Sequence, residues 1–319
     1  MKITLWGVRG SLPTPISGLD MEQKIKAALE LAKPGDISSP EAIDAFVNTL
    51  PFPIRFTYGG NTTCLEIESD IGDTFILDCG SGVKNLGKKL LTTDFGKGKG
   101  VASMIFSHTH WDHIHGIPFF VPFYIKGNIF NIYSPFKNMK ERLEYQQDAE
   151  HFPVTLDYMK STKNFYYIEP EEYFYINEVK ILSKLMPHPG GAYGYRFEEN
   201  GRIFIYTSDC EFNLTSIDEI EKYQSFFQDA DVVVFDTQYT FEESIDDKLE
   251  YGHSSASIAI DIAAKFNIKH LILFHHEPDY DDQKLENVLS KAKWYLNMNA
   301  ARLGNLKVDI AYEGMEIIL

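Results

Sequence analysis

The stretch His108-Thr109-His110-Trp111-Asp112-His113 places four side chains that can bind metal within six positions. It directly follows the apolar run 101–106, which is typical of a buried strand. The first two histidines lie two residues apart, so on an extended backbone both point to one side and can share an ion. The aspartate and the last histidine begin the next element and can turn toward a second ion. The spacing therefore predicts a metal-binding loop at a strand end rather than a histidine-rich surface loop.

Further candidate ligands stand at the ends of other short β-rich segments. These are Asp78 after 74–77, His188 in Met186-Pro187-His188-Pro189-Gly190-Gly191, Asp209 after 202–208, and His275 after 270–274. A sheet presents the residues at its strand ends along one edge, so we expect these side chains to meet. His276 is an alternative to His275, which we favour because it comes directly at the strand end.

This order of motifs resembles the metallo-β-lactamase superfamily, in which an Asp and a His-x-His-x-Asp-His motif are followed by separate His, Asp and His ligands. The resemblance covers nearly the whole chain. It implies an α/β fold of the αββα sandwich type and two divalent metal ions, zinc first, with manganese or iron as alternatives. Carried over by position, the first metal would be held by His108, His110 and His188, the second by Asp112, His113 and His275, and Asp209 would bridge them. Asp78 would orient a ligand histidine.

Smaller motifs resemble the phosphodiesterase side of that superfamily, which includes the transfer-RNA 3′-processing endonuclease (tRNase Z) and cyclic-nucleotide phosphodiesterases. They are Pro187-His188-Pro189-Gly190-Gly191, Gly252-His253-Ser254-Ser255, Gly7-Val8-Arg9-Gly10-Ser11 and Tyr58-Gly59-Gly60-Asn61-Thr62-Thr63. The resemblance implies a binuclear phosphodiesterase for a small phosphodiester, first a 3′,5′-cyclic nucleotide of the cAMP or cGMP type. The alternatives are a thioester or lactone hydrolase similar to glyoxalase II, and tRNA 3′ processing. The chain offers no candidate for the long basic, glycine-rich arm of tRNase Z.

The implied mechanism is attack by a metal-bound hydroxide, with His253 as the general acid that protonates the leaving alkoxide. Asp112 and Asp78 belong to the same catalytic machinery. The carboxylate that orients His253 is left open between Asp236 and Glu211, and a purely structural histidine at a helix start is the alternative reading of His253. We expect Ser254 to cap the helix that follows it.

Composition restricts the partners. The net charge is −16, which argues against a general surface for nucleic acid polymers or anionic membranes, because phosphate contacts need a dense basic face. The three cysteines are odd in number and lie in or beside apolar segments, which favours buried thiols in a reducing, cytoplasmic compartment. Metal ligation by Cys210 would instead suggest the β-lactam-cleaving branch. No apolar run approaches the length of a membrane span, and a homodimer would fit the relatives.

The elements predict one domain over residues 1–319, with a helical insertion at about 17–53. Apolar spacing predicts a helix from Met21 to Ala32, and a second helix from Pro40 to Leu50 capped by Ser39. Strands should resume near Phe56, and a long helix should run from Asp282 to Leu303. Arg9 and Asn61 are candidates for substrate contacts, although loop residues flanked by glycine are more often structural.

Overall fold

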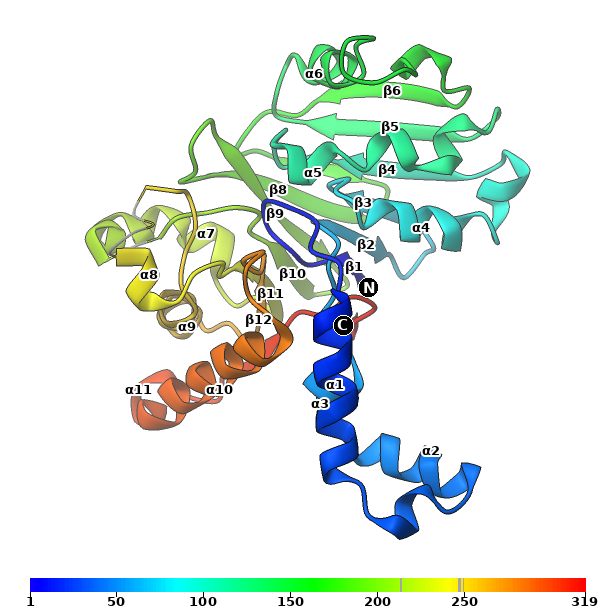
Figure 1. Ribbon diagram of the computed structural model, residues 1–319. Helices are drawn as coiled ribbons and strands as arrows, with labels where there is room; N and C mark the ends of the chain where they lie inside the picture. Colours follow the sequence, from blue (N-terminus) through cyan, green and yellow to red (C-terminus); the bar gives the residue numbers. More distant parts are fainter. Residues whose placement is uncertain (213, 246–247, 249) are drawn as a thin grey trace.

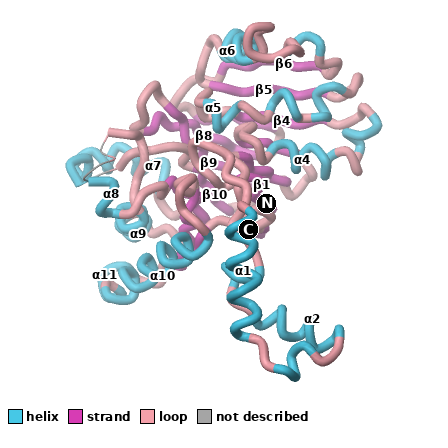
Figure 2. The backbone as a smooth tube through the Cα atoms, in the orientation of Figure 1, coloured by secondary structure: helices cyan, strands magenta, loops and turns pink. Residues whose placement is uncertain are grey.

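Two seven-stranded sheets face each other at the centre of the protein, and helices cover the outer face of each (Figures 1 and 2). The computed structural model describes residues 1–212, 214–245, 248 and 250–319. The first sheet has the strand order β14-β1-β2-β3-β4-β5-β6, and the second has the order β13-β12-β11-β10-β9-β8-β7. The αββα sandwich predicted from the sequence is therefore confirmed.

The strands of the first sheet are β1 (Lys2–Gly7), β2 (Cys64–Glu68), β3 (Thr74–Leu77), β4 (Val101–Ile105), β5 (Ile129–Ser134), β6 (Thr162–Tyr167) and β14 (Glu316–Ile318). Those of the second are β7 (Tyr173–Ile176), β8 (Val179–Met186), β9 (Ala192–Glu199), β10 (Arg202–Tyr206), β11 (Val232–Asp236), β12 (His270–Phe274) and β13 (Lys307–Ile310). In each sheet the central strands that lead into the candidate site run parallel, β3 beside β4 and β10 beside β11 and β12. Their carboxyl ends therefore lie along the same edge.

The α-helices are α1 (Gly18–Leu31), α2 (Pro40–Thr49), α3 (Phe52–Arg55), α4 (Val83–Leu90), α5 (Trp111–Ile114), α6 (Met139–Gln146), α7 (Gln224–Phe227), α8 (Phe241–Ile245), α9 (Ala256–Lys265), α10 (Asp282–Met298) and α11 (Ala300–Leu303). The 3₁₀ segments are η1 (Pro34–Ile37), η2 (Asp94–Lys97), η3 (Ile117–Phe119), η4 (Val121–Tyr124), η5 (Leu156–Tyr158) and η6 (Leu214–Tyr223). Among the described residues, every helix is too short or too polar to cross a bilayer.

The core has three layers, one between the sheets and one under each set of covering helices. Phe75 of the first sheet packs edge-on against Phe197 of the second, with ring centroids 5.8 Å apart. Behind the second sheet, Phe227 stacks on Phe235 and Phe266. Each buried side chain of this size contributes about 2–3 kcal/mol through the hydrophobic effect. The two sheets are thereby held rigidly, and the loops at their common edge gain a firm support.

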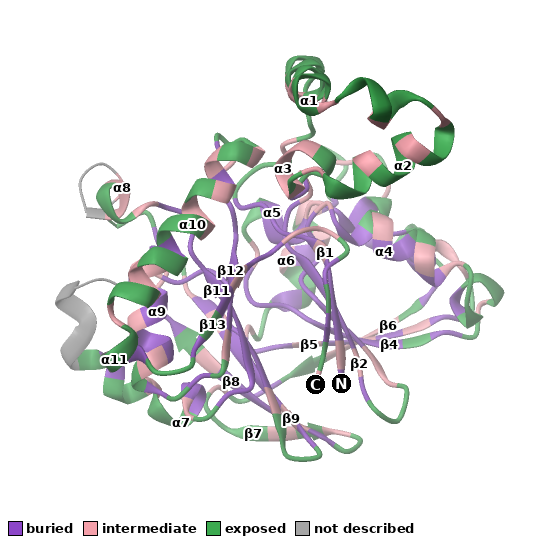
Figure 3. Ribbon diagram, turned by 90° about the horizontal axis from the view of Figure 1, so that it is seen from below, coloured by how far each residue is buried: buried purple, intermediate pink, exposed green. Residues whose placement is uncertain are grey.

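The insertion after β1 forms an arm of helices that projects from the sandwich (Figure 1), and Figure 3 shows that it is largely exposed. Both helices predicted in this segment are present. Ser17 caps α1 with a full capping box, and Ser39 caps α2 by accepting a hydrogen bond from the Ala42 amide. The strand predicted near Phe56 is wrong, because Pro51 starts the short helix α3 and Phe56 ends it as the C-cap.

Two further predictions about helices are corrected by the structure. The long helix predicted over 282–303 is two helices, because Asn299 leaves the helical conformation between α10 and α11. Ser254 does not cap α9: its hydroxyl donates to the Cys210 carbonyl at 2.6 Å and accepts from the Phe212 amide at 2.9 Å. The Ser254 hydroxyl therefore forms tertiary hydrogen bonds instead of the helix cap that the sequence predicted.

Candidate metal centre

Sharp backbone turns at the strand ends bring the candidate ligands together between the two sheets. Asp78, Ser208 and His275 all have positive φ values, of 55°, 58° and 64°. This left-handed conformation is strained for residues other than glycine and clusters at functional sites. It lets the chain leave the end of β3, β10 or β12 abruptly while the side chain there turns inward.

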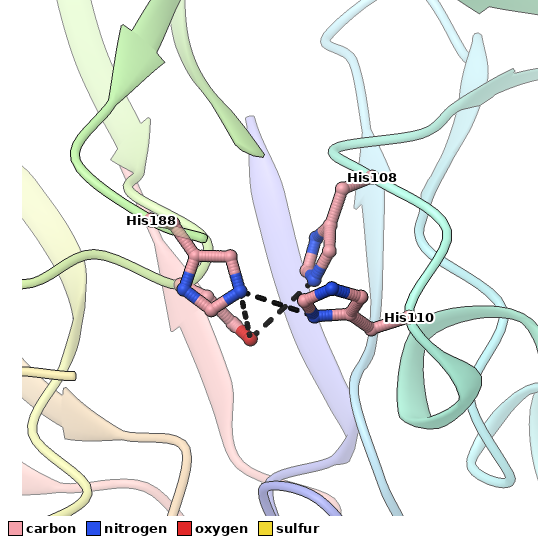
Figure 4. Close-up of side chains that lie close together, drawn as sticks. His108, His110 and His188 are labelled. Carbon is pink, nitrogen blue, oxygen red and sulfur yellow. Dashed lines mark hydrogen bonds and ion pairs between the residues drawn. The ribbon is translucent and has the colours of Figure 1, made fainter. Parts of the chain in front are cut away.

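A first group of possible ligands consists of three histidines and one carboxylate, His108, His110, His188 and Asp209. In Figure 4 the three imidazoles converge on one carboxylate oxygen. The Oδ2 atom of Asp209 lies 3.6 Å from His108 Nε2 and 3.9 Å from His188 Nε2, and His188 Nε2 lies 3.1 Å from His110 Nδ1. The resemblance implied that the same three histidines would hold one metal.

A second group shares Asp209 with the first and adds Asp112, His113 and His275. Asp209 turns its other oxygen, Oδ1, to this group, 3.1 Å from His113 Nε2 and 3.2 Å from His275 Nε2. Asp112 Oδ2 lies 3.1 Å from His275 Nε2. The carboxylate of Asp209 therefore has the position that a bridge between two ions requires, and the seven residues divide as the sequence motifs predicted.

The chemistry of these groups fits divalent cations. His108 Nε2, His113 Nε2 and Asp209 Oδ1 are buried and take part in no hydrogen bond among the described residues, a costly arrangement unless a ligand completes it. Burial lowers the pKa of His108 well below its usual value, so its imidazole is neutral, as metal binding requires. Burial would raise the pKa of Asp209, but the neighbouring histidines, His113 first, hold it well below its usual range. Burial would lower the pKa of His113, but Asp209 and Asp112 raise it well above its usual value, and a bound cation would displace its proton. The centre thus offers buried imidazole nitrogens and ionised carboxylates.

Asp78 supports this centre from behind. Its carboxylate lies 2.8 Å from His113 Nδ1, and it accepts hydrogen bonds from the Ser107 amide, the Ser107 hydroxyl and the Tyr206 hydroxyl at 2.6–2.8 Å. An acceptor on Nδ1 keeps the proton there and leaves Nε2 of His113 free to bind a cation. This is the orienting contact that the resemblance implied for Asp78.

His253 lies beside the centre and forms a dyad with a buried aspartate. Its Nδ1 atom is 2.7 Å from Asp236 Oδ2, and its ring centroid lies 4.9 Å from that of His275 and 5.4 Å from that of His188. Of the two carboxylates left open by the sequence, Asp236 is the partner. Glu211 instead accepts hydrogen bonds from the Gly252 and Glu250 amides. Burial lowers the pKa of His253, but Asp236 outweighs this effect and raises it to about 9.

Gly252 is the residue that allows His253 and a candidate ligand to approach each other. Its carbonyl oxygen accepts a hydrogen bond from His188 Nδ1 at 2.9 Å, and its φ is +95°. A Cβ atom at this position would lie 2.3 Å from His188 Nδ1. Only glycine therefore fits the Gly-His-Ser motif in this conformation.

Other sequence candidates lie outside the two ligand groups. His276 donates from Nε2 to the Ala311 carbonyl at 2.8 Å, and burial lowers its pKa to about 3, so His275 is the histidine that faces the centre. Arg9 is buried and donates to three carbonyls, those of Gly59, Glu277 and Tyr280, so it is a structural residue. Cys64, Cys79 and Cys210 are all buried free thiols, and Cys210 belongs to neither group.

Gln238 was missed by sequence reasoning. Its Oε1 atom lies 3.1 Å from His275 Nδ1, while its Nε2 donates to Ser11 Oγ at 3.2 Å and to Glu277 Oε2 at 2.5 Å. The two acceptors fix the direction of the amide, so Oε1 must face the imidazole. The signal available in the sequence was its place two residues after the strand-terminal Asp236, on the same side of the chain.

Replacing Gln238 with Ala is expected to weaken metal binding by about 10- to 100-fold, because His275 loses the acceptor that fixes its orientation and its proton. Competition between the protein and a chromogenic zinc chelator would measure this change without depending on turnover. Gln283→Ala, on α10, serves as the matched control. Equal zinc affinity in the Gln238 variant and the wild type would contradict the assigned role.

Comparison with known proteins agrees with this geometry. Residues 74–276 match the model of the β-lactamase superfamily domain. The chain is 27% identical over 267 residues to ribonuclease Z of Picrophilus torridus, covering 70% of this chain and 82% of the relative. It is 21% identical over 283 residues to ribonuclease Z of Oceanobacillus iheyensis, covering 73% of this chain and 88% of the relative.

Two solved structures share the fold over their whole length. Yeast PDE1 aligns with a TM-score of 0.67 at 14% identity and covers 100% of this chain and 99% of its own. The short form of human tRNase Z aligns with a TM-score of 0.61 at 15% identity, again covering 100% and 99%. The paired ligand groups, the αββα sandwich and the matched family model lead to one conclusion: the chain belongs to the metallo-β-lactamase superfamily, beside its ribonuclease Z-like members, and is a metal-dependent hydrolase.

Proposed function

We propose that this chain hydrolyses phosphodiester bonds, with RNA as the first candidate substrate. The observation that carries the proposal is the dyad of His253 and Asp236 beside the two ligand groups. An alkoxide is a poor leaving group and needs a proton from a positioned acid, whereas a thioester or a lactone has less need of one. The dyad therefore favours a phosphodiester over the thioester alternative.

The residues divide the work between them. His108, His110 and His188 would hold one ion, Asp112, His113 and His275 the other, and Asp209 both. Divalent metals at such a site supply an activated water and offset the negative charge of the phosphoryl group. Asp236 holds Nδ1 of His253, which leaves Nε2 to give a proton to the departing oxygen. Asp209 and Asp112, after Asp236, also contribute to raising the pKa of His253.

The substrate class rests on two observations that point in different directions. Several curated relatives bear the name ribonuclease Z, which supports RNA. The projecting arm, by contrast, carries six carboxylates and four cations over residues 17–56, so it lacks the basic character that gripping a folded RNA through its phosphates would need. This charge supports a second candidate, the cyclic nucleotide that the smaller motifs suggested.

A hydrolysis screen with the metal-reconstituted protein tests the proposal. We expect cleavage of a precursor transfer RNA at its 3′ side to be faster than cleavage of 3′,5′-cyclic AMP, and both to exceed that of a thioester. Asp209→Ala, prepared in parallel, controls for contaminating nucleases. Faster turnover of cyclic AMP would favour the second candidate. Fast cleavage of the thioester or a β-lactam, with no phosphodiester cleaved, would reject both.

A further inference from the structure

Helix α6 lies alongside the metal-binding loop and contacts both of its ends. Arg142 Nη1 lies 3.1 Å from the hydroxyl of Thr109, which stands between His108 and His110. Gln146 Nε2 donates to the Ile114 carbonyl at 2.8 Å, at the end of α5. The helix therefore runs beside the whole segment 109–114, within which three of the candidate ligands lie, His110, Asp112 and His113.

Two large aromatic side chains are exposed on these neighbouring segments. Trp111 is 81% exposed, although the next three residues of α5 are buried, and Tyr145 is 70% exposed. Arg142 and Gln146 face the metal loop, and in a helix residues three or four apart lie next to each other. Met139 and Leu143 therefore flank them on the side that is buried in the core, and Tyr145, three residues after Arg142, flanks them on the exposed side. Trp111 and Tyr145 therefore border the same stretch of surface.

Both rings expose a large aromatic surface to solvent. A tryptophan offers a large apolar surface, and a polar residue would be solvated here at no cost. Tyr145 contacts His151 edge to face, and nearby Phe119 is 54% exposed in contact with Phe152, so the aromatic surface extends beyond the pair. Exposed aromatic rings of this kind bind the flat faces of nucleobases by stacking. Arg142 lies on the same helix as Tyr145, and its guanidinium also lies 4.0 Å from the centre of the Phe136 ring.

We propose that Trp111 and Tyr145 form a binding site for a nucleobase next to the scissile phosphodiester. This inference rests on the proposed phosphodiesterase function. It restricts the preferred substrates to phosphodiesters that carry a base, as opposed to diesters that carry only a phosphate. A base of single-stranded RNA and the base of a cyclic nucleotide would both fit, and the experiment separates them.

Kinetics on base-bearing and base-free diesters test the site. With adenylyl-adenosine, Trp111→Ala and Tyr145→Ala are each expected to raise KM by about 10-fold, the size of a lost stacking contact. Values for glycerophosphoglycerol, which has no base, should stay within about 2-fold. Trp111→Phe should recover most of the loss, and Trp294→Ala is the matched control, since Trp294 is 63% exposed on α10. A 10-fold effect on adenylyl-adenosine but none on cyclic AMP would assign the site to RNA, and the reverse result to a cyclic nucleotide.

Binding without turnover keeps the two proposals separable. The chain has three tryptophans, and the Trp6 indole donates to Glu66 at 3.0 Å. Adenosine monophosphate should quench fluorescence in the wild type and in Trp294→Ala but not in Trp111→Ala, and ribose 5-phosphate should quench none of them. Quenching with no diester cleaved would uphold the base site and reject the phosphodiesterase. Three results would overturn the base site. They are equal quenching in the wild type and Trp111→Ala, equal KM changes on base-bearing and base-free diesters, and loss of metal from Tyr145→Ala.

Discussion

Replacing His253 with Ala is expected to slow the hydrolysis of phosphodiesters with alkoxide leaving groups by about 10²- to 10⁴-fold. The dyad with Asp236 leaves Nε2 of His253 as a proton donor, and an alkoxide without a proton departs slowly. Aryl phosphodiesters should lose much less, because a phenolate leaves without protonation. The ratio of kcat on the two substrate types measures the effect.

Two controls make this result specific. His270→Ala removes another histidine paired with an aspartate, Asp309 at 2.9 Å, at the start of β12 and outside the ligand groups, and should leave both activities unchanged. Metal content measured by elemental analysis should be the same in His253→Ala and the wild type. An equal loss on alkyl and aryl substrates would show that His253 only positions the substrate, and a loss of metal would make it a ligand or its support.

The second large effect concerns the metals themselves. Protein purified without chelators is expected to contain about two divalent ions per chain, zinc, manganese or iron, as the two groups of ligands imply. Asp209→Ala should weaken both sites and abolish activity, because its two oxygens face one group each. Asp231→Ala, a buried carboxylate before β11 and outside both groups, is the control for general destabilisation. A single tightly bound ion that added metal cannot supplement would reject the binuclear assignment.

Metal removal should also lower stability. Binding to the folded state alone contributes about 4 kcal/mol when free metal exceeds its dissociation constant a thousandfold. The carboxylates of Asp112 and Asp209 are buried in one ligand group, so the loss of cations removes positive charge from beside them. Thermal unfolding in the presence of a chelator should therefore begin several degrees lower, and restored zinc should reverse the change. An unchanged melting temperature would show that the metals do not contribute to folding.

The substrate is the point on which sequence reasoning and the comparisons differ most. Small motifs such as Gly7-Val8-Arg9-Gly10-Ser11 suggested a cyclic nucleotide, whereas the curated relatives support RNA. In the structure Arg9 donates to backbone carbonyls, so this residue of the motif has the structural role expected of a loop residue flanked by glycine. The nucleobase site on Trp111 and Tyr145, in turn, was not visible in the sequence, where these residues are 34 positions apart.

The sequence by itself determined the candidate ligands and the strand ends that present them. This was possible because the signals are local. His108 and His110 lie two residues apart just after a strand, and Asp78, Asp209 and His275 each follow a short apolar run. The capped helices of the arm were predicted for the same reason, since a cap and its first turn lie within four residues.

Only the tertiary structure decided which residues support the centre. Asp236 rather than Glu211 holds His253, Gln238 faces His275, and Ser254 bonds to Cys210 in place of capping a helix. Each of these contacts joins segments 17 to 44 residues apart, and strand pairing and sheet packing bring them together. Nothing in the local pattern distinguishes one buried polar partner from another, because hydrogen-bond geometry depends on where the backbones meet. For this protein the sequence therefore determined which side chains can bind metal or transfer a proton. The packing of the two sheets determined which hydrogen-bond partners orient those side chains.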